Sequence, residues 1–233
     1  MKTLTSPLVA LAIGTLCSLS AEASTVTFTD FAHGSQTVTA TLSSPNGPLV
    51  LNNVSAGGFA TTLDGGPSFE SYCVDLYQTI SFNTPYTDYL APVGFHHFTN
   101  RNAYADLGRL YGIAGLVNTA LQEAAFQIAV WEIAYEDTGT PYSLSSGSAT
   151  FAGGTADSSG ALTLAASWLS NLGNGSYPSI GVLDSPGQQD VIFAPIPEPS
   201  TYLLMALGLM GLGFVAQRRS RSVGQSFGVL SYS

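Results

Sequence analysis

Lysine is almost absent from this sequence, because Lys2 is its single copy. Between residues 24 and 196 the only cationic residues are Arg101 and Arg109, against thirteen Asp and Glu residues, so the net charge there is about −11. Proteins bind nucleic acid by neutralising phosphates with Lys and Arg, and anionic membrane surfaces likewise attract basic proteins. This composition therefore excludes nucleic acid as a partner and disfavours an anionic membrane surface.

Cysteine is also scarce, with Cys17 near the N-terminus and Cys73 in the middle of the chain. If Cys17 is removed with an N-terminal segment, Cys73 cannot form an intrachain disulfide. A leftover cysteine in an exported protein indicates intermolecular pairing or a reactive thiol. The alternative is a small, buried, inert side chain.

Familiar catalytic motifs are missing as well, since there is no Gly-x-Ser-x-Gly elbow, Walker loop or zinc-protease helix. The adjacent His96 and His97 would point to opposite faces of a strand, and no third ligand follows at a useful spacing. Choosing a glycosidase pair among the many carboxylates is not justified, because the required separation is spatial. We therefore predict no metal, no cofactor and no enzymatic turnover.

The N-terminus has the pattern of a signal peptide. A positive start at Lys2 is followed by an apolar stretch over residues 8–19 and by the small-x-small sequence Ala21-Glu22-Ala23. We predict a signal peptide over residues 1–23 with cleavage after Ala23. Lipid modification of Cys17 is disfavoured, because Leu16 stands where lipoprotein signals require a small residue.

Three features follow one another near the C-terminus. A Pro-Glu-Pro motif (Pro197, Glu198 and Pro199) comes first, and an apolar run over residues 202–216 comes next. An arginine cluster follows, made of Arg218, Arg219 and Arg221. Crossing a bilayer takes about 20 apolar residues, with a lower limit near 17. We predict a short transmembrane helix at about residues 201–217. The arginines favour a cytoplasmic location for the end that follows it, which places the upstream domain across the membrane.

This order of features resembles the PEP-CTERM sorting signal of Gram-negative bacteria that make exopolysaccharide. The resemblance covers residues 197–221 and implies recognition by an exosortase, a membrane cysteine protease that cuts near the Pro-Glu-Pro. It implies a protein held in the inner membrane before processing and then located at the cell surface or outside the cell. Such chains usually stop soon after the arginines, whereas this one continues as a short tail over residues 222–233.

Residues 24–196 have a length suited to one domain with a sizeable core. Residues 25–78 are rich in Thr, Val, Ser and Phe and are broken by Gly and Pro near 45–48 and 65–67, which predicts strands separated by turns. Polar and apolar residues alternate over residues 25–29, as in a half-buried strand. A closing strand is expected over residues 189–194.

The texture changes after residue 102, where Ala, Leu, Ile, Tyr and Glu recur at helical spacing. We predict two helices between residues 102 and 136, separated at 112–115, and a third over 161–172, with a loop over 137–160. Strands followed by inserted helices predict an α+β fold, a β-rich sandwich or barrel-like domain.

Cys73 and Gln127 are the candidate chemical pair. If residues 69–78 form a strand, Cys73 and Asp75 lie on the face opposite Tyr72. On a helix over residues 116–136, Gln127 projects from the apolar face, where Glu123 also lies, with Glu132 and Glu136 opposite. A buried amide needs a partner, and a backbone partner would make Gln127 an ordinary structural residue.

Two motifs, Tyr72-Cys73-Val74-Asp75-Leu76 and Phe126-Gln127-Ile128-Ala129-Val130-Trp131, resemble those of the thioester (TQxA) domains of bacterial surface proteins. The resemblance implies an internal thioester between Cys73 and Gln127. Attack of the thiolate on the carboxamide releases ammonia and stores an acyl group that a partner can later capture. In such a site Asp75 holds or passes a proton, and Tyr72, Phe126 and Trp131 limit access of water.

The missing lysines bear on the identity of that partner. A lysine-free domain cannot couple to another copy of itself through a lysine, so the expected partner is a foreign protein amine, a small amine or a hydroxyl of matrix polysaccharide. The alternative function is a noncovalent structural or adhesive component of the exopolysaccharide or biofilm matrix. In that case Cys73 and Gln127 are merely packed together.

Overall fold

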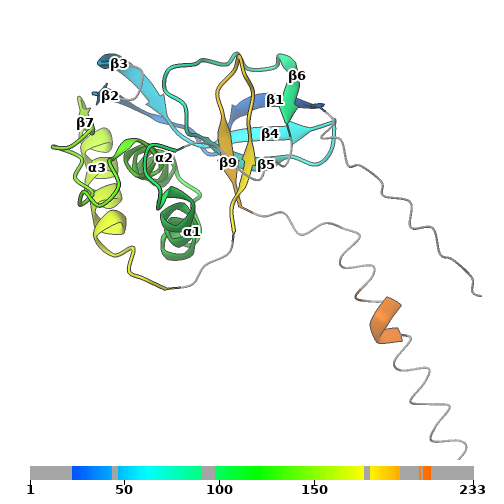
Figure 1. Ribbon diagram of the computed structural model, residues 1–233. Coiled ribbons are helices and arrows are strands. Elements are labelled where there is room, and N and C mark those ends of the chain that lie inside the picture. Colours follow the sequence, from blue (N-terminus) through cyan, green and yellow to red (C-terminus); the bar gives the residue numbers. More distant parts are fainter. Residues whose placement is uncertain are drawn as a thin grey trace, which may run out of the picture.

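The computed structural model describes residues 23–43, 47–90, 98–175, 179–194, 205 and 207–210 (Figure 1). The first half is built of strands, as the sequence predicts: β1 (Ala23–Phe31), β2 (Gln36–Leu42), β3 (Leu49–Ala56), β4 (Phe59–Leu63), β5 (Phe69–Cys73) and β6 (Pro85–Leu90). Helices and shorter strands follow: α1 (Ala103–Ala114), α2 (Ala120–Tyr135), β7 (Ala149–Gly153), α3 (Ala156–Ser170), β8 (Gly181–Leu183) and β9 (Val191–Phe193).

The strands form two antiparallel sheets, one in the order β6-β1-β4-β5-β9-β8 and one in the order β3-β2-β7. In the larger sheet, Leu90 and Asp184 exchange backbone hydrogen bonds of 2.9 and 3.4 Å. This bridge joins the end of β6 to the residue after β8, so the two edges of the sheet approach each other. The sheet is therefore curled toward a half-barrel, which confirms the predicted α+β, barrel-like class.

Strand β1 shows why the alternating pattern near the start of the chain is informative. Val26 and Phe28 are fully buried, whereas the threonines between and beside them are partly or fully exposed. One face of β1 therefore covers the core, and the predicted half-buried strand is confirmed.

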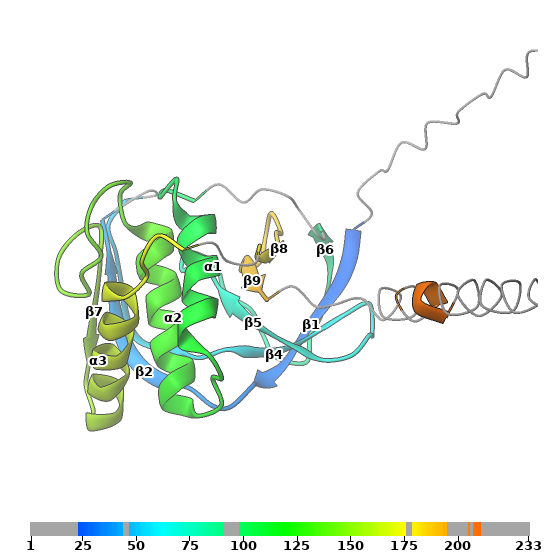
Figure 2. The same cartoon turned by 90° about the horizontal axis from the view of Figure 1, so that it is seen from below.

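Helix α2 lies between α1 and α3 and also contacts β3, β5 and β7 (Figure 2). Every residue from Glu123 to Tyr135 is buried. The predicted polar face is therefore wrong: Glu132 and Glu136 are 0% and 1% exposed. A helix that is surrounded by other elements has no side left for solvent.

The helix boundaries differ from the sequence-based ones because of local caps. Helix α1 continues past residue 112 and ends at Gly115, whose φ of 65° favours glycine. Helix α2 begins at Ala120, since Thr119 Oγ1 accepts the Gln122 N–H at 3.3 Å. Helix α3 begins five residues before the predicted start, where Thr155 and Ser158 form a capping box.

The strands that the sequence analysis missed are short and are held by distant partners. The predicted loop over residues 137–160 contains β7, which pairs with β2. Strand β6 pairs with β1, and β8 pairs with β9. Each lies at a sheet edge, where its own sequence carries little periodicity.

Several predictions lie outside the described residues: the signal peptide up to Glu22, His96 and His97, the Pro-Glu-Pro motif, most of the transmembrane segment and the arginine cluster. Within the described part of the chain, no helix is both long enough and apolar enough to cross a membrane.

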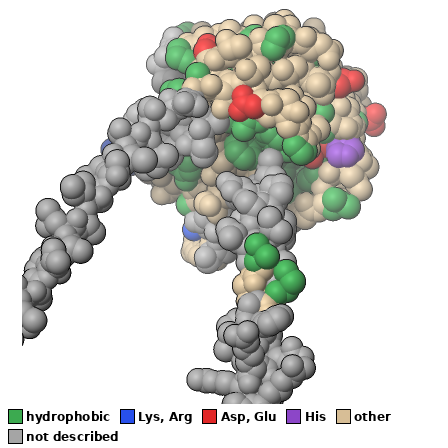
Figure 3. All heavy atoms as spheres, turned by 90° about the vertical axis from the view of Figure 1, so that its right-hand side faces the viewer, with side chains coloured by type: hydrophobic (Ala, Val, Ile, Leu, Met, Phe, Trp, Pro, Cys, Tyr) green, Lys and Arg blue, Asp and Glu red, His purple; other side chains and the backbone are tan. Residues whose placement is uncertain are grey.

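Figure 3 shows one face of the domain, on which a few acidic side chains are scattered over a largely uncharged surface.

Candidate functional site

Strand β5 and helix α2 bring Cys73 and Gln127 together, although 54 positions separate them in the sequence. Cys73 is the last residue of β5, and Gln127 lies in the middle of α2. The Cys73 N–H donates to Gln127 Oε1 at 3.0 Å, and Gln127 Nε2 donates to the Cys73 carbonyl at 2.7 Å. The carboxamide is thus held against the Cys73 backbone, and both residues are 1% exposed.

The strand that carries Cys73 is shorter than predicted, since β5 ends at Cys73 and not at residue 78. Beyond it, the Val74 N–H donates to the Asp190 carbonyl at 2.9 Å. The Leu76 N–H then donates to the Tyr135 hydroxyl at 2.8 Å, and the Tyr77 N–H donates to Asp75 Oδ1 at 2.8 Å. Side chains therefore replace the strand partners that a continued β5 would need.

The Cys73 thiol lies in the core. Because Ser71, Tyr72 and Val74 are buried as well, both faces of β5 are covered, so the face opposite Tyr72 also belongs to the core. Burial raises the pKa of Cys73 to about 12, with smaller upward contributions from the charges of Asp75 and Asp190. Trp131 and the Asp75 backbone act in the opposite direction. The thiol is thus protonated at neutral pH, and its Sγ donates to the Asp75 carbonyl at 3.1 Å.

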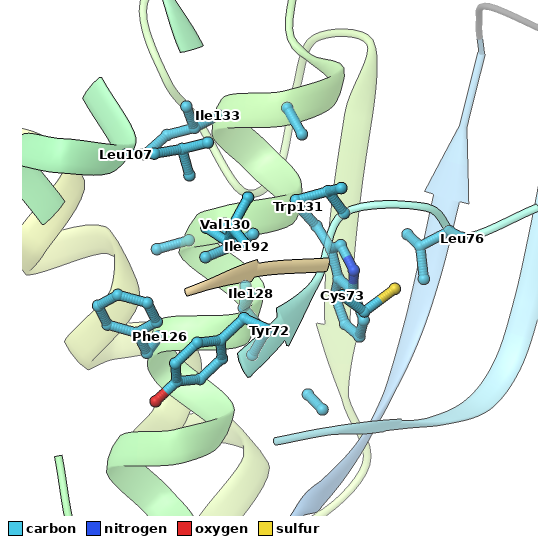
Figure 4. Close-up of a cluster of buried hydrophobic side chains, with 14 of the residues drawn as sticks. Tyr72, Cys73, Leu76, Leu107, Phe126, Ile128, Val130, Trp131, Ile133 and Ile192 are labelled. Atoms are coloured by element: carbon cyan, nitrogen blue, oxygen red, sulfur yellow. The ribbon is translucent and has the colours of Figure 1, made fainter. Parts of the chain in front are cut away.

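Figure 4 shows the Trp131 ring beside Cys73, and Tyr72 and Phe126 packed against each other in the same buried cluster. The rings of Tyr72 and Phe126 have centroids 4.4 Å apart, and Trp131 stacks on Phe151 at 6.1 Å. All three predicted neighbours are 2% exposed or less. Because Cys73 and Gln127 are themselves only 1% exposed, bulk water does not reach either side chain.

A second cluster of polar side chains lies one turn earlier on α2. His33 Nδ1 lies 2.6 Å from Glu123 Oε1. The Tyr72 hydroxyl lies within hydrogen-bond distance of both Glu123 Oε2, at 2.9 Å, and Glu70, and can donate its single proton to one of the two. The Gly58 N–H donates to Glu123 Oε2 at 3.1 Å. Since Tyr72 precedes Cys73 and Glu123 precedes Gln127 by four residues, this cluster adjoins the first site.

Burial is the main cause of the raised pKa values in this second cluster. Burial, with smaller contributions from the charge of Glu123 and its hydrogen bond to Glu70, raises the pKa of Glu70 to about 8. Burial, followed by the charges of Glu70 and Glu123, raises the pKa of Tyr111 well above its ordinary value. The sequence analysis missed this cluster because its members come from distant segments, although a glutamate on the apolar face of α2 was a usable signal.

Comparison with known families bears on the C-terminus. A family model for the PEP-CTERM protein-sorting motif matches residues 195–219. The chain carries a PEP-CTERM sorting motif. The match includes Pro197, Glu198, Pro199, Arg218 and Arg219 and ends before Arg221.

The PEP-CTERM motif implies export through a membrane-anchored intermediate and processing by exosortase, a membrane protein. It covers the end of the chain and leaves the folded domain unmatched. No curated protein and no solved structure matches the sequence. The function of the domain must therefore be inferred from its own residues.

Proposed function

We propose that this PEP-CTERM protein forms a thioester between Cys73 and Gln127 and uses it to attach covalently to an amine or hydroxyl at the cell surface or in the extracellular matrix. The pair of hydrogen bonds between the Gln127 carboxamide and the Cys73 backbone carries the proposal. These bonds hold the carboxamide against the backbone of the residue that carries the nucleophile. Well-oriented neighbouring groups reach effective molarities of about 10⁵ M or more.

In the proposed step, Cys73 Sγ attacks the Gln127 carboxamide carbon and the carbon–nitrogen bond breaks. The thiol proton passes to the departing nitrogen, which leaves as ammonia, so atoms and charge balance. The Cys73 N–H at 3.0 Å from Oε1 stabilises the negative charge that develops on that oxygen. Because the pKa of Cys73 is raised, proton transfer accompanies the attack and does not precede it.

Capture by a partner breaks the bond between the acyl group and the Cys73 sulfur. An amine or hydroxyl of the partner attacks the acyl carbon, the thiol of Cys73 is released, and an amide or ester joins the two molecules. Residues 24–196 contain no lysine, so the attacking group belongs to another protein, a small amine or matrix polysaccharide. A spent thioester does not regenerate, which makes the domain a single-use linker and not an enzyme.

A second candidate function is a noncovalent structural or adhesive component of the exopolysaccharide or biofilm matrix. The same two hydrogen bonds favour it, because they fully occupy the Cys73 backbone and one donor and one acceptor of Gln127. The buried, protonated thiol is equally compatible with inert packing.

Treatment with methylamine distinguishes the two functions. If the thioester forms, the folded exported protein incorporates one methylamine at Gln127, found by peptide mass mapping, and exposes the Cys73 thiol to iodoacetamide. The Cys73→Ala variant is the matched control and should incorporate none. A correctly folded wild type that fails to incorporate methylamine would instead support the noncovalent function.

A further inference from the structure

A cluster of three possible metal ligands, of which only Glu123 is buried, adjoins the proposed thioester. His33 follows β1, Glu70 lies in β5 and Glu123 lies in the first turn of α2. One ligand atom from each residue lies within 4.8 Å of the other two. We propose that His33, Glu70 and Glu123 bind a first-row divalent metal ion of the Zn²⁺ type, which ties these three segments together.

The charge balance of the domain supports a cation there. Glu123 has a fully buried side chain, and Glu70 lies against it through their shared partner Tyr72. Of the described residues only two carry a guanidinium and none is a lysine: Arg101 is exposed, and Arg109 pairs with Asp106. Buried carboxylates are costly unless they are paired or bind a metal. In the described part of the chain the basic residue that pairs with Glu123 is His33, with Nδ1 2.6 Å from Oε1, and not an arginine or lysine.

A buried hydroxyl provides an independent sign of a missing ligand. The Tyr111 ring packs edge-on against Tyr72 with centroids 6.3 Å apart. Its hydroxyl oxygen is buried and has no hydrogen-bond partner in the described structure. Buried polar atoms are nearly always satisfied, so an ion or an ion-bound water beside Glu70 and Glu123 would account for it.

The backbone approaches closely on another side of the cluster. A Cβ at Gly58 would lie 2.5 Å from Glu123 Oε2 and 3.0 Å from Glu70 Oε1. Glycine at this position therefore lets the main chain lie directly against the two carboxylates, and the Gly58 N–H fixes the orientation of Glu123. The His33 side chain is 43% exposed, which leaves a route for an ion to enter.

The kinds of ligand atom in the cluster indicate which ion it would bind. One imidazole nitrogen and carboxylate oxygens suit Zn²⁺, whereas Ca²⁺ prefers six to eight oxygen ligands. The expected effect of binding is to fix the end of β1 and the start of α2 against β5, next to Cys73. The proposal does not depend on the thioester, because its ligands exclude Cys73 and Gln127.

Isothermal titration tests the proposal on the exported full chain, prepared without a histidine tag and stripped of metal with chelator. We expect the wild type to bind one Zn²⁺ per chain and to bind Ca²⁺ far more weakly. His33→Ala and Glu70→Gln should each weaken Zn²⁺ binding by more than the roughly 10–100-fold that is typical when a residue that only orients a ligand is removed. Asp30→Asn, at an exposed neighbouring carboxylate, is the control and should bind like the wild type.

Urea unfolding of the metal-free proteins checks that each variant is folded, and His33→Ala should be, since His33 is partly exposed. A wild type that binds no Zn²⁺ would overturn the proposal. Equal Zn²⁺ binding by wild type, His33→Ala and Glu70→Gln would place the ion elsewhere and would overturn it as well. Calcium binding as tight as zinc binding would contradict the assignment of the ion.

Discussion

In a Cys73→Ala background, in which no thioester can form, replacing Gln127 with leucine should lower the free energy of unfolding by about 2–5 kcal/mol, because the N–H and carbonyl of residue 73 would both lose their side-chain partner inside the core. Each buried polar group left without a hydrogen bond costs about 1–3 kcal/mol. Leucine has nearly the shape of glutamine and leaves no large cavity. Urea unfolding followed by circular dichroism measures the change.

The matched control for this prediction is Gln122→Leu in the same background, five residues earlier on α2. Gln122 is only partly buried, and its side chain bonds the backbone of Asn118 and the hydroxyl of Thr119 near the helix start. We expect that variant to lose no more than about 1 kcal/mol. Equal losses of unfolding free energy in the two variants would show that the hydrogen bonds between Gln127 and Cys73 stabilise the fold no more than those of Gln122.

The stability of the protein should fall as the pH rises from about 5 to about 8, and Glu132→Gln should remove much of that fall. Burial raises the pKa of Glu132 to about 8 from 4.5; the Ser143 N–H opposes the shift and the charge of Glu136 adds to it. The folded state therefore holds a proton that the unfolded state releases in this window, so unfolding becomes easier as pH rises. Each pKa unit corresponds to about 1.4 kcal/mol.

Glutamine fits the Glu132 site, because its oxygen can keep the bond that Glu132 Oε1 accepts from the Ser143 N–H at 2.6 Å. The other oxygen, Oε2, is buried without a hydrogen-bond partner in the described structure. Glu70 titrates in the same range, so the slope should decrease without vanishing. Unfolding at a series of pH values, with exposed Asp157→Asn as control, checks this. An unchanged slope in Glu132→Gln would contradict the assignment.

Local sequence patterns were sufficient to predict the elements that carry the candidate pair. Alternation identified β1, and helical spacing placed Gln127 inside α2. Both succeed because each pattern is encoded within a few neighbouring residues. The pairing of Cys73 with Gln127 came from the motif resemblance alone; the structure bonds the Gln127 side chain to the Cys73 backbone, and the thioester itself stays a prediction.

Features that depend on tertiary packing could not be predicted in the same way. Nothing near Glu132 signals that α1, α3 and the strands enclose α2, so its helix position alone favoured an exposed side chain. Strand β5 stops at Cys73 because distant groups, among them the hydroxyl of Tyr135, bind the following backbone. The cluster of His33, Glu70 and Glu123 likewise exists only after three segments meet.

Intact mass of the exported protein tests the proposed thioester most directly. The wild type should be lighter by one ammonia than its processed sequence predicts, and Cys73→Ala should have the mass that its sequence predicts. Brief treatment with methylamine should replace the deficit in the wild type with an excess of one CH₂, because methylamine is added where ammonia left. A folded wild type with the full mass of its sequence would contradict the thioester between Cys73 and Gln127.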